Sequence, residues 1–166
     1  MLAIALATTV RAADDWKTYR YPQDGFAAEY PIPPTPQDAK PEPERIIRGK
    51  QYWSERDDVA FGVSATLFLH KIITGQSPDK QIQNVIEGVR GSLKCSIRSQ
   101  RPISFPGSTA REIIFDKCPA PLVGAKERIF IAGDRLFQVM VLGSKAGVLE
   151  SPDTKRFMES FSLIAQ

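Results

Sequence analysis

The feature that constrains this chain most is a hairpin pattern over Lys126–Ser144. Two apolar runs flank Gly133-Asp134, and glycine takes the positive φ of a tight turn at no steric cost. The second run, Leu136–Leu142, places apolar groups at odd and even positions alike, with Gln138 as its only polar interruption. A strand that is apolar on both faces is covered on both faces. We therefore expect this strand at the centre of a sheet with layers on either side.

Turn and capping residues divide the rest of the chain. Strand pairs are expected over 16–30 about the turn 22–25, over 45–69 about the charged turn 55–57, and over 95–118 about Pro106-Gly107. Ser-Pro-Asp at 77–79 and at 151–153 predicts two helix starts, each with a serine N-cap. The proline-rich stretch 31–43 is expected to be a loop, because proline donates no hydrogen bond to a strand ladder. This order predicts an α+β fold with an antiparallel meander sheet.

Composition limits the domain organisation and the partners. The 166 residues, 42% hydrophobic and 25% charged, are enough for one core, so we expect one domain over 13–166. The net charge of +3 comes from mixed basic and acidic residues, without a basic block or a basic helix face. Nucleic-acid binding is therefore not expected.

Residues 1–12 resemble the end of a signal peptide. An apolar run is followed by Val10-Arg11-Ala12, a small-residue pattern that predicts cleavage after Ala12. A start upstream of Met1 stays open, because the run lacks the usual positive residues before it. The run is far shorter than the roughly 20 residues that span a bilayer, so no transmembrane segment is expected. We expect a periplasmic or secreted protein.

Three motifs resemble landmarks of the PsbP-like superfamily. They are W-x-x-Y-x-x-P-x-D-G-F-x-x-x-Y-P over Trp16–Pro31, G-D-R-L-F-Q-V over Gly133–Val139, and R-F-x-x-S-F over Arg156–Phe161. The superfamily includes the photosystem II extrinsic protein PsbP, a yeast Ran-binding import factor and bacterial periplasmic proteins such as DcrB. The resemblance implies an α/β/α sandwich, with helices on both faces of the sheet, and non-catalytic accessory roles. It transfers no catalytic residue to this chain.

Catalytic, cofactor and metal signatures are missing from the sequence. His70 is the only histidine, and we expect it at a strand end on the surface rather than in a metal site. Neither a G-x-S-x-G elbow nor a phosphate-binding glycine motif occurs. The acidic pairs Asp14-Asp15 and Asp57-Asp58 lack the alternating ligand spacing of a calcium loop. We therefore expect no cofactor, no metal and no enzymatic activity.

The densest group of basic residues runs from the end of the first helix into the next strand. It consists of Arg90, Lys94, Arg98 and Arg101, and we call it the basic cluster. It is a possible surface for an acidic partner or an anionic lipid. The alternative is that its cations only complement the negative end of a helix dipole.

Cys95 and Cys118 are the only cysteines, and in an exported protein they are expected to form a disulfide. They lie equally far from the turn at Pro106-Gly107, so a two-residue turn places them directly opposite each other. The same register pairs Arg101 with Glu112. Pro102 indicates an edge strand or a bulge, and a bulge would shift the pairing by one position.

The function that these patterns favour is an exported, non-catalytic binding or accessory module with an unknown protein partner and an open oligomeric state. The first alternative is a periplasmic protein that binds a small apolar ligand in a pocket lined by Phe61, Phe68 or Met140. The second is a hydrolase with a dispersed site, in which a serine or a carboxylate of perturbed pKa meets His70 or a lysine.

Overall fold

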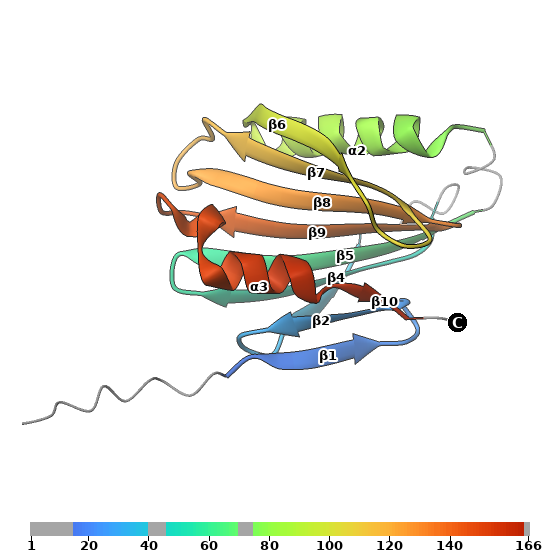
Figure 1. Ribbon diagram of the computed structural model, residues 1–166, viewed down its shortest axis with the longest axis horizontal. Coiled ribbons are helices and arrows are strands. Elements are labelled where there is room, and N and C mark those ends of the chain that lie inside the picture. The colour runs from blue at the N-terminus through green and yellow to red at the C-terminus, as the bar shows by residue number, and fades with distance from the viewer. Residues whose placement is uncertain (1–14, 40–45, 70–74, 165–166) are drawn as a thin grey trace, which may run out of the picture.

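The computed structural model describes residues 15–39, 46–69 and 75–164. Within these residues the main sheet has seven strands in the order β3-β4-β5-β9-β8-β7-β6, and all neighbours are antiparallel (Figure 1). Strand β9 is the fourth of the seven, which confirms its predicted place at the centre. The strands are β3 (Thr35–Asp38), β4 (Ile46–Arg56), β5 (Val59–Phe68), β6 (Ser96–Ile103), β7 (Thr109–Asp116), β8 (Gly124–Ala132) and β9 (Arg135–Gly143).

The predicted N-terminal hairpin forms a separate small sheet. Strands β1 (Lys17–Tyr21) and β2 (Phe26–Tyr30) pair about the predicted turn, and β10 (Ser162–Leu163) joins β2 from the other side. This sheet and helix α3 (Pro152–Ser160) cover one face of the main sheet, and α2 (Pro78–Leu93) lies on the other (Figure 1). A short 3-10 helix, η1 (Val148–Glu150), precedes α3.

Both helices begin where the capping chemistry predicts. The side chain of Ser77 accepts a hydrogen bond from the backbone N–H of Lys80 at 3.4 Å, and that of Ser151 accepts one from Thr154 at 3.2 Å. Each bond satisfies one of the backbone donors that a helix leaves unpaired at its first turn. The predicted starts of α2 and α3 are therefore confirmed.

The core occupies both faces of the main sheet, and strand β9 contributes to each. Phe137 packs on the α3 face, where its ring centroid lies 5.6 Å from that of Phe161. Leu136 packs on the α2 face with the fully buried Ile82 and Ile86. Burying an aromatic or aliphatic side chain of this size stabilises the fold by about 1.5 to 3 kcal/mol. This two-sided packing is the α/β/α sandwich predicted from the sequence, with the small sheet added to the α3 layer.

Two local predictions need correction. Part of the proline-rich stretch is not a loop but the edge strand β3, where Pro36 lies opposite Tyr52 and an outward-facing position needs no N–H. The turn between β4 and β5 is formed by Asp57-Asp58 rather than by 55–57, with Asp57 at a φ of 53°. The prediction that Pro102 marks an edge strand or a bulge is confirmed in its first alternative, because β6 is an edge strand. A register shift also occurs in β6, but between Ile97 and Ser99.

Candidate functional site

Helix α2 covers only part of its face of the main sheet. It packs on β7 and β8, and a groove of about 350 Å³ lies between the helix and strands β4, β5 and β9. Val85 also lines a second hollow of about 260 Å³ toward the start of the helix, so the two hollows adjoin. We call them together the α2 groove.

The lining of the α2 groove comes from the helix on one side and from the sheet on the other. From the helix come Val85, Gly88, Val89, Ser92 and Leu93, and from the sheet Gln51, Trp53, Gly62, Ser64, Gln138 and Met140. The adjoining hollow adds Phe68, Gln76, Gln81, Asn84, Ile131 and Leu136. Among the described residues, every lining side chain is apolar or an uncharged amide or hydroxyl. The groove therefore offers hydrogen-bonding groups and apolar contacts without a fixed charge.

Trp53 lies flat on the sheet at one wall of the groove. A Cβ built on Gly62 would lie 2.5, 2.5 and 2.7 Å from three adjacent atoms of the indole, and near-equal distances mean that the ring face covers Gly62. Only glycine leaves room for this contact. The indole N–H donates to Oε1 of Gln51 at 3.1 Å, which fixes the ring in its plane. The partly exposed ring is therefore held as a rigid wall of the groove.

A buried carboxyl group lies beside the groove, on the same face of the main sheet. Glu127 of β8 is fully buried, with Ile113 and Met140 as its cross-strand neighbours. Its Oε1 accepts a hydrogen bond from Nε2 of Gln138 at 2.8 Å, and its Oε2 finds no partner in the part of the chain that the structure describes. Burial raises the pKa of Glu127 to about 7, against the opposing effect of the Gln138 hydrogen bond. Gln138 thus connects a titratable group to the groove.

The predicted ligand-lining residues separate in the structure. Met140 and Phe68 line the α2 groove, as predicted. The prediction is wrong for Phe61, which is fully buried on the opposite face of β5. Alternation along a strand sends neighbouring positions to opposite faces, which explains the split. His70 lies outside the described residues, and the partner of the perturbed carboxyl of Glu127 is an amide.

Glu127 itself was missed by the sequence analysis. The alternation along β8 could have found it, because Glu127 shares a strand face with Ala125, Ile129 and Ile131, all of which are buried. A charged residue at an inward position of a central strand indicates either a functional group or a satisfied internal pair.

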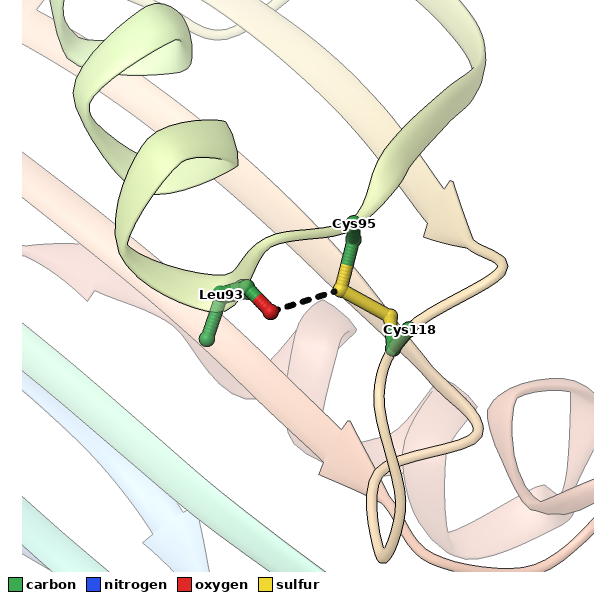
Figure 2. The surroundings of a disulfide bond; sticks show 3 residues. All are labelled: Leu93, Cys95 and Cys118. Atoms are coloured by element: carbon green, nitrogen blue, oxygen red, sulfur yellow. Dashed lines mark hydrogen bonds between the residues drawn. A yellow bond between two sulfur atoms is a disulfide. The ribbon is translucent and has the colours of Figure 1, made fainter.

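The two cysteines meet at the open end of the β6–β7 hairpin (Figure 2). Their sulfur atoms are 2.00 Å apart and their Cα atoms 4.2 Å apart, which is disulfide-bonding distance. Arg101 lies opposite Glu112, as predicted. Beyond the register shift Ser96 lies opposite Asp116, so the strand register does not place the cysteines directly opposite each other as predicted. Cys95 lies just before β6 and Cys118 just after β7, and outside the paired residues they still meet. The Sγ of Cys95 also lies 3.5 Å from the carbonyl oxygen of Leu93, at the last residue of α2, so the bridge joins this hairpin where α2 ends.

The structure does not bring the basic cluster together as one unpaired surface. Arg90 and Lys94 lie at the end of α2, whereas Arg101 lies on the α3 face of the sheet beside Glu112. Each arginine has an acidic partner: Arg90 pairs with Glu87 at 2.8 Å, Arg98 with Glu150 at 3.4 Å and Arg101 with Glu112 at 2.7 Å. Internal carboxylates therefore offset much of the charge that suggested an acidic partner.

Glu112 connects the main sheet to α3. Its carboxylate, whose side chain is 4% exposed, accepts hydrogen bonds from Arg101 and from Arg128. Arg128 also donates to the carbonyl oxygen of Met158 in α3 at 2.9 Å. Burial would raise the pKa of Glu112, but the bonds from the two arginines and the charge of Lys126 together lower it. This group is a structural ion-pair network, not a site with free charge.

Two further properties of the described residues bear on the site. In residues 15–39, 46–69 and 75–164, no helix combines the length and the apolar character that crossing a bilayer requires. The same residues contain no group of three or more histidine, cysteine, aspartate or glutamate side chains placed to hold a metal ion.

Comparison with known proteins identifies the fold. No protein-family model matches the sequence, and no curated protein matches it. The chain is similar in structure to cyanobacterial PsbP (CyanoP) from Synechocystis sp. PCC 6803, whose solution structure superposes with a TM-score of 0.62 at 10% sequence identity. The match covers 96% of this chain and 98% of that one. The PsbP-like fold predicted from the three sequence motifs is therefore confirmed.

Proposed function

We propose that this PsbP-like chain is an exported, non-catalytic binding module that holds its ligand or partner in the α2 groove. The observation that carries the proposal is the half-covered sheet face, where α2 leaves β4, β5 and β9 to line a groove of about 350 Å³. Pockets for small ligands typically range from about 300 to 1,000 Å³ and combine apolar walls with a few placed polar groups.

Two features support export. The sequence over 1–12 has the apolar run and small-residue cleavage pattern of a signal peptide. Cys95 and Cys118 lie at disulfide-bonding distance, an arrangement typical of oxidising compartments. Export predicts a mature protein that begins at Ala13 and fractionates with the periplasm or the medium. A cytoplasmic protein that retains residues 1–12 would contradict this part of the proposal.

A matched pair of glycines in α2 allows a direct test of the groove. Gly88 lines the groove and Gly91 does not, yet a Cβ added at either position meets nothing within 4 Å. Gly88→Trp should fill the groove, and Gly91→Trp should place the same side chain in solvent. Both variants should fold, because glycine is a poorer helix former than tryptophan by about 0.5 kcal/mol.

The assay is capture by the tagged wild-type protein and by both variants from periplasmic extract, with mass spectrometry of bound proteins and small molecules. A ligand or partner of the groove should be retained by the wild type and by Gly91→Trp but lost from Gly88→Trp. Identical sets of bound species for all three proteins would place the binding function elsewhere.

A further inference from the structure

The chemistry of the α2 groove narrows what it can bind. Among the described residues its polar lining consists of amides and hydroxyls, including Gln51, Ser64, Ser92 and Gln138, without a charged side chain. A charged ligand would lose hydration there without gaining an opposite charge, which is costly. Each amide both donates and accepts hydrogen bonds, so the lining suits uncharged groups that also do both, and hydroxyl groups have that property.

Trp53 adds a flat apolar wall to this polar lining. One face of its indole covers Gly62, and its N–H is bonded to Gln51, so the ring is held in place and its opposite face is left for the groove. A rigid aromatic surface binds flat apolar faces at low conformational-entropy cost. A sugar ring combines such a face, formed by its C–H bonds, with hydroxyl groups at its rim.

Gln138 is oriented by the buried carboxyl group of Glu127. Its Nε2 donates to Glu127 at 2.8 Å, which leaves its Oε1 as an acceptor at the lining of the groove. Glu127 keeps a second oxygen without a partner in the described part of the chain, so the pair is held by one bond within an otherwise apolar setting. The groove therefore presents a fixed acceptor close to the sheet, suited to a hydroxyl donor on the ligand.

The position of the groove argues against an extended peptide, which has similar hydrogen-bonding groups. Peptides that bind in extended form usually pair with the free edge of a sheet. The sheet side of this groove includes β5 and β9, which pair with each other and with a further strand on either side, so their backbone groups are already bonded. Only side chains remain to contact the ligand.

We propose that the α2 groove binds a neutral oligosaccharide, with one sugar ring packed on Trp53 and hydroxyl groups bonded to Gln138 and Ser64. This inference rests on the proposed function, because it specifies the ligand class of the same groove. The adjoining hollow beside Gln81 and Asn84 continues the amide lining along α2 and accommodates a further sugar unit.

The test uses the oxidised full-length mature protein on an array of neutral glycans, followed by calorimetric titration of N-acetylchitotetraose, maltotetraose and cellotetraose. At least one neutral glycan should bind. Trp53→Ala should weaken its binding by about tenfold, the loss expected for one aromatic contact. Gly88→Trp should abolish binding, and Gly91→Trp should leave it unchanged. Circular dichroism verifies that each variant is folded. If Trp53→Ala does not fold, the comparison of Gly88→Trp with Gly91→Trp decides the result.

Heparin tetrasaccharide, laurate and pentaalanine are the acidic, apolar and peptide controls. Binding of any of these without binding of a neutral glycan would overturn the inference, as would glycan binding that Gly88→Trp leaves intact. If no glycan on the array bound, the inference would also be overturned. The proposed function would still stand if the species captured from extract by the wild type and by Gly91→Trp were lost from Gly88→Trp. If the captured species were also the same for both variants, the proposed function would fall as well.

Discussion

The buried carboxyl group of Glu127 should make the stability of this protein depend on pH in a defined direction. Burial raises the pKa of Glu127 from 4.5 to about 7 in the folded protein. The unfolded chain therefore releases this proton near pH 4.5, whereas the folded protein keeps it until about pH 7. Because the folded state binds more protons in this window, its stability falls as the pH rises through it.

The size of the effect follows from the same values. The pKa of Glu127 rises from 4.5 to about 7 on folding, and at about 1.4 kcal/mol for each pKa unit this corresponds to about 3 kcal/mol of folding free energy. The stabilising effect of the neutral form is complete below pH 4.5, is lost progressively up to about pH 7 and changes no further above it. A loss of this size is a large fraction of the roughly 5 to 15 kcal/mol by which domains are stable.

Glu127→Gln tests this reasoning, because it keeps the shape and an acceptor for Gln138 but removes the ionisation. Urea unfolding under non-reducing conditions, followed by circular dichroism from pH 4 to pH 9, gives the free energy of unfolding of the variant and the wild type. The advantage of the variant should grow by about 3 kcal/mol between pH 4 and pH 8. Glu159→Gln, at an exposed position of α3, serves as the control and should leave the wild-type profile in place.

Subtracting the two profiles removes the contribution of all other titrating groups, so only the change with pH matters. A difference between Glu127→Gln and the wild type that stays constant from pH 4 to pH 9 would refute the argument. It would mean that Glu127 is hydrated in solution and ionises as freely in the folded protein as in the unfolded chain.

Three further predictions concern the ion pairs, the cysteines and the basic cluster. Glu112→Gln should lower the free energy of unfolding by about 3 kcal/mol at pH 7, because it leaves Arg128 without its buried partner. The loss should be smaller in acid, where the carboxylate of the wild type, with its lowered pKa, becomes protonated as well. Arg101→Ala removes an exposed partner of Glu112 and should lower the free energy of unfolding by about 1 kcal/mol or less. If urea unfolding gave equal losses for Glu112→Gln and Arg101→Ala, the assigned network would be contradicted. Thiol counting on the denatured, unreduced protein should find no free cysteine, and Cys95→Ser with Cys118→Ser should lower stability by about 3 kcal/mol for this loop length. Arg90→Glu with Lys94→Glu should leave the protein folded and weaken capture of any acidic partner at low salt more than at high salt; unchanged capture at low salt would mean that these cations only complement the helix end.

Elements whose determinants lie within a few residues were predictable from the sequence. Ser77 and Ser151 cap helices through bonds to the residue three positions on, and Gly133 takes a φ of 60° in the central turn. The apolar residues on both faces of Leu136–Leu142 indicated a strand inside the layered sheet, because a strand with one face in solvent would expose half of these side chains. The cysteine pairing was predictable because the chain has only two cysteines and one turn brings their strands together, although the register shift in β6 displaces the exact positions.

Features that depend on distant segments were decided only by the tertiary structure. Pro36 lies in a strand because β4 passes beside it, and Arg98 is paired because Glu150, 52 positions away, folds next to it. The α2 groove exists because α2 packs on β7 and β8 and leaves the neighbouring strands uncovered. The raised pKa of Glu127 follows from the same packing, since desolvation depends on every layer around a carboxyl group and no local pattern specifies those layers.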